Sequence, residues 1–473
     1  MRKTKIICTI GPASESEEVL KKMCLAGMNV ARLNFSHGTH PEHEKKIAAI
    51  KKVREELHLP IAIMLDTKGP EYRIGTFEEG KIYLNEGDTF TFTSDEIVGN
   101  QERVSVSYKT FAQEMNPGDK VLVNNGLVVL EVVETSGNDV VCKVLSGGKL
   151  SDRKSMNFPG KRLRGAYMSE QDQADVLFGI EHGVDFVAAS FVSDGADAKE
   201  MRDFLDAHGG EDIDIVAKIE NQSGIDHVDE ICKYADGIMV ARGDLGVEIP
   251  FTQVPSVQKN LVEKCRMLGK RVVVATEMLE SMIENIRPTR AEVSDIANAI
   301  YEGTSAIMLS GESAAGKHPV EAVQAMANIA EETEQHIDYA EWFENVRFTT
   351  TSNLDAVSHA ACRMAIDVGA KCIAVSSVSG ITARMISRFR CPVPIMGITT
   401  SEKAYRKLAL SWGVLPRLCE RFDSLDVIFY HAMREAQRMF DLEEGDNIVM
   451  TGGRIGEGKG KSNTIRLETI RKR

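Results

Sequence analysis

The residues best suited to chemistry in this chain follow short apolar runs, at the point where each run ends. Lys218 and Glu220 are separated by one residue at the end of such a run, and Asp244 follows the next run. Two carboxylates on neighbouring strand ends, with a lysine beside them, suit a hard divalent cation such as Mg²⁺, which prefers oxygen ligands. The ammonium group would neutralise a transferring phosphoryl group or a developing enolate, and Arg242–Gly246 would leave backbone amides free to bind an anion. The alternative is an ion pair between Lys218 and Glu220 that only closes the rim of the fold.

A second group of polar residues ends another run. Arg32, Asn34 and Ser36 alternate along the chain, so their side chains point to the same side of an extended segment. A guanidinium, an amide and a hydroxyl on one side are suited to a phosphate and a cation. The alternative is that Ser36 caps a helix while Arg32 forms a salt bridge at the rim.

Hydroxyl groups end two further runs. Thr276 follows Val272–Ala275, and Ser310 ends the last run. A threonine at a strand end is usually a cap. Thr276 would lie beside the strand of Asp244, however, where it could bind a carboxylate or help to deliver a proton.

Eight short runs rich in Val, Ile and Ala have the length of strands that are buried on both faces. Amphipathic stretches of helical length separate most of them, such as Glu18–Ala26, Pro255–Leu268 and Arg290–Tyr301. Strand and helix alternating eight times predict an α/β fold, a parallel (β/α)8 TIM barrel whose active site lies at the carboxyl ends of the strands. The predicted strands are Lys5–Ile10, Met28–Phe35, Ile61–Lys68, Asp185–Val192, Asp214–Asn221, Gly237–Asp244, Arg271–Met278 and Ser305–Glu312.

More than a hundred residues separate the third predicted strand from the fourth, too many for one crossover helix. Tyr72–Val141 alternates polar and apolar residues and is broken by turn signals, as in a small all-β domain. We therefore expect an inserted small β-barrel at residues 70–168. Asp66 and Thr67 lie at its root and Arg73 just inside it, so its position suits a lid that closes over the site.

After a predicted helix at Val320–Ile337 the pattern changes again. Strands with helices between them predict a smaller, doubly wound α/β domain. These strands are Lys371–Ser376, Pro394–Thr399, Val414–Leu418 and Asn447–Thr451, with Thr464–Ile470 as a candidate fifth. The predicted domains are the catalytic barrel at 1–69 and 169–345, the inserted lid at 70–168 and the C-terminal domain at 346–473.

Composition limits the classes of function. A formal net charge of −13 argues against a general binder of nucleic acid or of a membrane surface. No apolar run approaches the roughly 20 residues needed to span a bilayer, and the start of the chain has no signal-peptide pattern. Nine cysteines without a Cys-x-x-Cys pair favour reduced thiols in the cytoplasm.

Several segments together resemble the pyruvate kinase family, and the resemblance covers the whole chain. Its most specific segment is Met239–Glu248, and the others are Thr9–Ser14, Arg32–Gly38, Asp66–Glu71, Lys218–Asn221 and Met308–Glu312. The resemblance implies transfer of the phosphoryl group of phosphoenolpyruvate to ADP, giving pyruvate and ATP in glycolysis. It also implies a cytoplasmic homotetramer that uses Mg²⁺ (or Mn²⁺) and K⁺, with a C-terminal domain that binds a sugar-phosphate or nucleotide effector.

The resemblance assigns a role to each matching residue. Glu220 and Asp244 would hold Mg²⁺, and Lys218 would stabilise the transferring phosphoryl group. Arg32 would bind the substrate phosphate, and Gly243, Asp244 and Thr276 its carboxylate, with Thr276 and Ser310 as candidates for the proton relay. The potassium site would be Asn34, Ser36, Asp66 and Thr67. The nucleotide side would be Pro12, Asn34, Phe35, Ser36, His37, Arg73 and Lys154.

The chain departs from the family pattern in several places, one of which is Lys161–Met168, where the usual leucine-proline turn is missing. Glu277 stands where the family often has glutamine, which adds a negative charge beside the site. The C-terminal phosphate loop lacks its usual basic residue, which Arg454, Lys459 or Lys461 of a later loop could supply. The predicted effector-binding residues are Ser377, Ser379, Gly380 and Thr382, and the alternative is a vestigial loop that caps the helix starting at Thr382.

Two other functions remain open on the sequence. One is a Mg²⁺-dependent barrel aldolase or lyase acting on pyruvate or phosphoenolpyruvate, which would not need the potassium residues or Arg73. The other is a non-catalytic metabolite-binding relative. Such a protein is expected to have lost Lys218, Arg32 or a metal carboxylate, and all of these are present.

Overall fold

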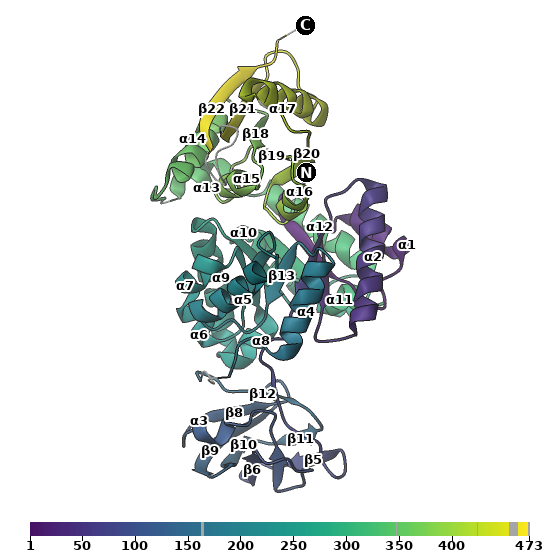
Figure 1. Ribbon diagram of the computed structural model, residues 1–473, viewed down its shortest axis with the longest axis vertical. Helices are drawn as coiled ribbons and strands as arrows, with labels where there is room; N and C mark the ends of the chain where they lie inside the picture. Colours follow the sequence, from purple (N-terminus) through teal and green to yellow (C-terminus); the bar gives the residue numbers. More distant parts are fainter. Residues whose placement is uncertain (162–164, 347, 423, 454–461, 472–473) are drawn as a thin grey trace.

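A computed structural model describes residues 1–473 except 162–164, 347, 423, 454–461 and 472–473. Three parts follow one another along the long axis of the molecule (Figure 1). A closed barrel with its surrounding helices lies in the middle, a β-rich insert lies at one end, and an α/β part lies at the other.

The closed barrel consists of eight parallel strands, which confirms the predicted fold class. Neighbours around the barrel are β1, β17, β16, β15, β14, β13, β3 and β2, in that order. The strands are β1 (Lys5–Thr9), β2 (Val30–Asn34), β3 (Ala62–Asp66), β13 (Phe186–Ala189), β14 (Asp214–Ile219), β15 (Gly237–Ala241), β16 (Arg271–Ala275) and β17 (Ala306–Leu309). Side chains such as Met64, Phe186 and Met239 fill the interior, so the barrel has a packed core.

Helices surround the barrel because the strands present a second apolar face outward, against which each helix packs its apolar stripe. The outer elements are α1 (Glu17–Ala26), α2 (His40–Leu57), α4 (Glu170–Glu181), α5 (Gly195–Ala207), α6 (Gln222–Asp226), α7 (Val228–Tyr234), η1 (Phe251–Gln253), α9 (Val254–Met267), η2 (Glu280–Ile283), α10 (Arg290–Tyr301), α11 (Gly311–Ala314) and α12 (Pro319–Gln335). The next helix, α13 (Tyr339–Asn345), instead packs Phe343 into the core of the C-terminal part (Figure 1). Several predicted strands end earlier than expected, among them those predicted to reach Met278 and Glu312, which end at Ala275 and Leu309. The strand expected to reach Asp244 ends at Ala241, and the chain turns at once into α8 (Arg242–Glu248).

The insert is a sheet that closes on itself. Its main sheet has the order β4-β12-β8-β9-β10-β6-β7, and β11 pairs with β5. A bridge between Ile74 and Val106 and a hydrogen bond of 2.9 Å from Ser107 N to Arg73 O join the two edges, which makes a small barrel. The elements are β4 (Tyr72–Arg73), β5 (Lys81–Leu84), β6 (Thr89–Thr93), β7 (Arg103–Ser105), α3 (Phe111–Glu114), β8 (Lys120–Val123), β9 (Val128–Ser136), β10 (Asp139–Ser146), β11 (Gly148–Ser151) and β12 (Ser155–Asn157).

The C-terminal part is a five-stranded sheet in the order β20-β19-β18-β21-β22. Helices α14 and α15 pack on one face and α17 on the other, as expected of a doubly wound domain. The fifth strand, β22, is present but runs antiparallel to β21. The elements are α14 (Asn353–Asp367), β18 (Cys372–Ser376), α15 (Ile381–Ser387), β19 (Ile395–Thr399), α16 (Glu402–Leu408), β20 (Val414–Leu418), α17 (Leu425–Phe440), β21 (Asn447–Gly453) and β22 (Ser462–Thr469).

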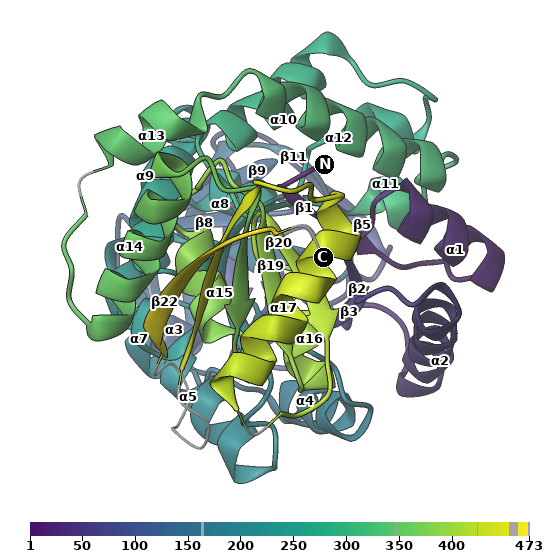
Figure 2. The same ribbon diagram turned by 90° about the horizontal axis from the view of Figure 1, so that it is seen from above.

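The C-terminal part covers the amino ends of the barrel strands (Figure 2). Leu410, which follows α16, is buried with the side chains that fill the barrel interior. Arg406 Nε donates to the Asp185 carboxylate at 2.8 Å, directly before β13, and Lys407 Nζ donates to Asp214 at 2.7 Å, at the start of β14. The opposite, carboxyl ends of the strands therefore face the insert. In the part of the chain that the structure describes, no helix is long and apolar enough to cross a membrane.

Removing the Arg406 side chain is expected to lower the stability of the protein. Asp185 is fully buried, so Arg406→Met leaves a carboxylate with its closest cationic partner removed, at a cost of about 3 kcal/mol. We expect the thermal unfolding midpoint, followed by calorimetry, to fall by several degrees. Lys199→Met, which removes an exposed ion pair with Asp203, is the control and is expected to have little effect. Equal shifts of the unfolding midpoint in the two variants would contradict a stabilising role for the contact between Arg406 and Asp185.

Candidate active site

Lys218 lies at the carboxyl end of β14, among polar groups from three neighbouring strand ends. Its Nζ lies 3.1 Å from Asp66 Oδ1, 2.7 Å from Ser190 Oγ and 3.0 Å from Glu220 Oε1. Asp66 also accepts a hydrogen bond of 2.6 Å from Arg32 Nε through its other oxygen. The Asp66 carboxylate thus joins the two cations that the sequence placed on separate strand ends.

Burial and charge act against each other in this cluster. Burial alone would raise the pKa of Asp66, but the neighbouring Arg32 and Lys218 charges outweigh it and hold that pKa below its usual value. Burial alone would lower the pKa of Lys218, but the carboxylates of Asp66 and Glu220 raise it above its usual value. Both groups are therefore charged throughout the physiological pH range, which provides a permanently cationic side chain at the barrel mouth.

Glu220 has one oxygen in use and one without an aligned hydrogen bond. Its Oε2 accepts from Phe191 N at 2.6 Å, while Oε1 is buried and has only the Lys218 ammonium nearby. Burial raises the pKa of Glu220, Asp244 raises it further, and Lys218 opposes the change. A buried carboxylate oxygen that faces a cation and accepts no aligned hydrogen bond fits a site for a metal ion.

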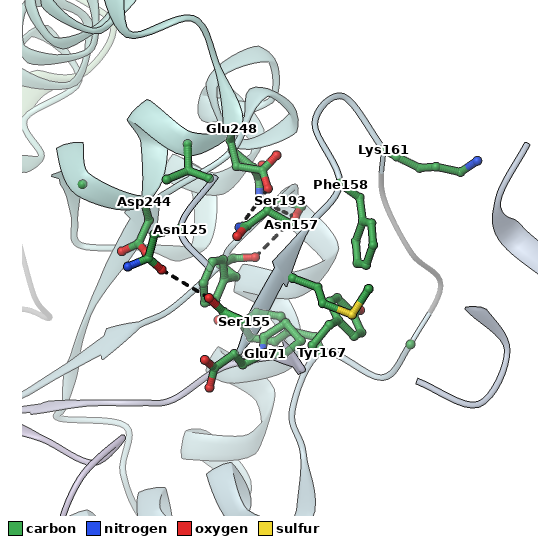
Figure 3. A pocket seen from close by; sticks show the side chains of 18 of the residues that line it. Glu71, Asn125, Ser155, Asn157, Phe158, Lys161, Tyr167, Ser193, Asp244 and Glu248 are labelled. Atoms are coloured by element: carbon green, nitrogen blue, oxygen red, sulfur yellow. Dashed lines mark hydrogen bonds between the residues drawn. The ribbon is translucent and has the colours of Figure 1, made fainter. Parts of the chain in front are cut away.

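Asp244 lies in the first turn of α8, is exposed, and lines the cleft beside the barrel mouth (Figure 3). Within the described residues, no group of three or more His, Cys, Asp or Glu side chains could hold a metal ion. Glu220 and Asp244 would therefore supply only part of an octahedral coordination. This arrangement suits Mg²⁺, which usually keeps several waters and binds phosphate oxygens.

Thr276 is joined to the start of α8. Its Oγ1 accepts a hydrogen bond of 2.8 Å from Gly243 N and donates one of 2.6 Å to Ala275 O. The Gly243 amide is therefore already in use, which corrects the expectation that the amides of this segment are free. Ser310 directly follows β17, and its backbone N–H donates to Glu312 at 2.7 Å.

The four residues predicted to bind potassium lie on adjoining strand ends. Asn34 and Asp66 are register partners in β2 and β3, and Thr67 follows directly. Ser36 is exposed, and its N–H donates to Asn34 Oδ1 at 3.1 Å. Ser36 does not cap the next helix. The N-cap of α2 is Thr39, which pairs with Glu42 in a capping box.

The predicted nucleotide residues divide between the barrel and the insert. Pro12 and His37 are exposed after β1 and β2, and Arg73 and Lys154 lie in the insert, where Arg73 donates to Arg153 O at 2.7 Å. The Phe35 ring instead lies in the core, stacked on the His43 ring with 3.9 Å between the ring centroids. The predicted nucleotide contact of Phe35 therefore does not involve its ring.

The insert and the barrel enclose a cleft of about 460 Å³ (Figure 3). Asn157 Nδ2, on β12, donates a hydrogen bond of 3.1 Å to Glu248 Oε1 at the end of α8. This contact joins the insert to the helix that carries Asp244. The cleft is lined by residues of both parts, among them Glu71, Ser155, Asn157, Asp244, Glu248 and Glu277.

Three residues of the site are absent from the sequence-based prediction. Ser190 contacts both Lys218 and Asp66, Phe191 donates its N–H to Glu220, and Arg242 binds the backbone after β16. Ser190 directly follows β13, so the pattern of hydroxyl groups at strand ends was the signal that could have identified it. Phe191 acts through its backbone and has no such signal.

The predicted effector residues surround the start of α15. Gly380 is its N-cap with φ = 75°, a left-handed conformation that favours glycine. Thr382 Oγ1 is buried and 2.7 Å from Ser462 Oγ. The helix begins at Ile381, one residue earlier than the alternative interpretation placed it. Arg454, Lys459 and Lys461 lie outside the described residues.

Comparisons with known proteins match both large parts of the chain. The family model described as "Pyruvate kinase, barrel domain" matches residues 1–323, and "Pyruvate kinase, alpha/beta domain" matches residues 355–468. The chain belongs to the pyruvate kinase family. Figure 1 shows both matched parts, with the insert within the first.

Similar pyruvate kinases cover nearly the whole chain. Curated relatives from Clostridium perfringens and Geobacillus stearothermophilus are 44% and 45% identical over 99% of this chain, which spans 100% and 80% of their respective lengths. A crystal structure of a pyruvate kinase from Cryptosporidium parvum is 37% identical, with a TM-score of 0.93 over 99% of this chain and 96% of that one.

The contact between Asn157 and Glu248 predicts how pH affects closure of the cleft in an Asn157→Asp variant. Burial raises the pKa of Glu248 to about 7 in the wild type, and a carboxylate in place of the Asn157 amide raises it further, so in the variant this carboxyl is protonated at pH 6 and loses its proton as the pH rises through 8. Two facing carboxylates repel at pH 8, whereas a protonated Glu248 can donate to its neighbour at pH 6. Small-angle X-ray scattering should therefore give a larger radius of gyration at pH 8 than at pH 6. The wild type, whose amide donates at both pH values, is the control, and a variant insensitive to pH would contradict the role of this contact.

Proposed function

We propose that the protein is a phosphotransferase that transfers the phosphoryl group of phosphoenolpyruvate to ADP, giving pyruvate and ATP in glycolysis. The observation that carries the proposal is the Lys218 ammonium, held between Asp66, Ser190 and Glu220 at the barrel mouth. Phosphoryl transfer mainly requires that a protein align the reactants and neutralise the charge on the phosphate, and a fixed cation beside two carboxylates supplies both. Membership of the pyruvate kinase family supports the same reaction.

The substrate side of the site is formed by Arg32, Lys218, Gly243, Asp244 and Thr276. Arg32 and Lys218 bind the phosphate of phosphoenolpyruvate, because each is a permanent cation oriented by Asp66. A hydrogen bond joins Gly243 to Thr276 at the ends of β15 and β16, and Asp244 follows Gly243 directly, so the substrate carboxylate binds beside these three residues.

Glu220 and Asp244 hold a divalent cation, Mg²⁺ or Mn²⁺. The buried Glu220 oxygen without a hydrogen bond supports this assignment. When bound, the ion supplies positive charge to the phosphate oxygens and to the enolate. Lys218 and Arg32 add to that charge from the side of the phosphate.

A potassium ion is assigned to Asn34, Ser36, Asp66 and Thr67. Oxygen atoms from two adjacent strand ends meet there, which suits a hard cation. Pro12, Asn34, Ser36, His37, Arg73 and Lys154 form the nucleotide side. The last two belong to the insert, so ADP binds where closure of the cleft brings the insert to the barrel.

Loss of the phosphoryl group leaves the enolate of pyruvate, which takes up a proton at carbon. Thr276 is the candidate that delivers this proton, with Ser310 and water as further members of the relay. Its hydroxyl donates to Ala275 O, so it turns away from that carbonyl when it delivers the proton to the enolate. A threonine hydroxyl is a weak acid, and a chain of such groups is needed to resupply it.

Regulation is assigned to the C-terminal domain, where Ser377, Ser379, Gly380 and Thr382 bind a phosphorylated effector. The left-handed Gly380 at the start of α15 supports a close approach of backbone to phosphate. We further propose that the enzyme works as a homotetramer in the cytoplasm, as the family resemblance implies.

A coupled assay of pyruvate formation from phosphoenolpyruvate and ADP tests the proposal. The activity should require Mg²⁺ or Mn²⁺ and should rise on addition of K⁺. Absence of turnover in any ion mixture would reject the reaction, whereas turnover that K⁺ does not affect would reject only the potassium site.

Lys218→Met is expected to lower turnover by about a thousandfold, because it removes the ammonium group that lies 3.0 Å from Glu220 Oε1. Binding of Mn²⁺, measured by electron paramagnetic resonance, should be largely preserved, and circular dichroism should show the fold intact. Lys371→Met, at an exposed lysine of the C-terminal domain, is the matched control. An unchanged rate in Lys218→Met would contradict the proposed role of Lys218 in phosphoryl transfer.

A further inference from the structure

Arg242 is the first residue of α8 and directly precedes two substrate-binding residues, but its side chain reaches away to the next strand end. Its Nη2 donates to Thr276 O at 2.7 Å and to Glu277 O at 3.0 Å, and its Nε donates to Thr276 O at 3.2 Å. Its Nη1 binds both carboxylate oxygens of Asp295, on α10, at 2.8 and 2.7 Å. All three guanidinium nitrogens are therefore engaged, with one side of the group bound to the backbone after β16.

The backbone that Arg242 binds has an unusual conformation. Thr276 and Glu277 have φ values of 69° and 54°, so two consecutive residues with side chains adopt the left-handed region. This region is unfavourable for residues other than glycine, and such residues keep it only when their surroundings hold them there. The three hydrogen bonds to the Thr276 and Glu277 carbonyls are contacts that can hold this turn.

The turn decides where the Thr276 hydroxyl lies. Thr276 Oγ1 accepts from Gly243 N at 2.8 Å, and Gly243 is the residue after Arg242. The start of α8 therefore contacts the end of β16 in two ways, through a backbone amide to the hydroxyl and through a guanidinium to the carbonyls. Together these contacts make the two substrate-binding segments one unit.

We propose that Arg242, oriented by Asp295, is a positioning residue that holds the left-handed turn at Thr276 and Glu277 and so places the Thr276 hydroxyl against the substrate. This inference rests on the proposed function, because the hydroxyl has no such task without a substrate carboxylate or enolate. Lysine cannot replace Arg242, since one ammonium group cannot reach two carbonyls and a carboxylate in the fixed fork geometry of a guanidinium.

The test compares Arg242→Gln, Arg242→Lys, Thr276→Val and the double variant Arg242→Gln/Thr276→Val in the coupled assay. Each Arg242 variant should lower kcat/KM for phosphoenolpyruvate by about 100-fold, the effect expected of a misplaced group. The KM for ADP and Mn²⁺ binding should stay unchanged. Arg438→Gln, at an exposed arginine on α17, is the matched control for the substitution.

The double variant separates positioning from a general structural role. If Arg242 acts through the Thr276 hydroxyl, Arg242→Gln should lower kcat/KM by no more than about threefold in the Thr276→Val background, because the effects of coupled residues are not additive. Exchange of the methyl protons of pyruvate with deuterated water should fall in parallel with pyruvate formation. A 100-fold loss in both backgrounds, or no loss in the wild-type background, would overturn the proposal. An inactive wild type would instead reject the proposed function.

Discussion

The site depends on one buried carboxylate, Asp66, which contacts Arg32 and Lys218 at the same time. Two cations cannot be held close together in a barrel mouth unless an anion offsets their repulsion, and the low local dielectric makes this requirement strict. Because Asp66 ends β3, which pairs with β2 on one side and β13 on the other, it lies between the strands that carry the two cations. Pairing of β2, β3, β13 and β14 and assembly of the site are therefore one structural event.

The same strands are held at both of their ends. Asp185 lies directly before β13 and Asp214 begins β14, and these carboxylates bind Arg406 and Lys407 of the C-terminal part. At their other ends the two strands carry Ser190 and Lys218 to the site. Parallel strands place all carboxyl ends on one side, so the site and the contacts of α16 lie at opposite ends of the barrel. The C-terminal part thus anchors the strands whose opposite ends carry the cation of the site.

Residues that follow the local period of the chain were predictable, and those defined by contacts over long distances were not. Lys218 and Glu220 follow an apolar run at a spacing of two, which identifies them from the sequence. The hydrogen bond from Arg242 to Thr276 joins residues 34 positions apart in the sequence. It also depends on a left-handed backbone conformation that no local sequence pattern indicates. The burial of the Phe35 ring against His43 likewise depends on how α2 packs on the barrel.

The most direct measurement is a crystal structure of the protein with Mg²⁺ and oxalate, a dicarboxylate that resembles the enolate of pyruvate. We predict one metal ion with an oxygen of Glu220 and an oxygen of Asp244 at about 2.1 Å. Oxalate should complete the coordination, with Lys218 Nζ within hydrogen-bond distance of it. A metal bound away from Glu220 and Asp244, or a Lys218 side chain directed away from the oxalate, would contradict this arrangement of the site.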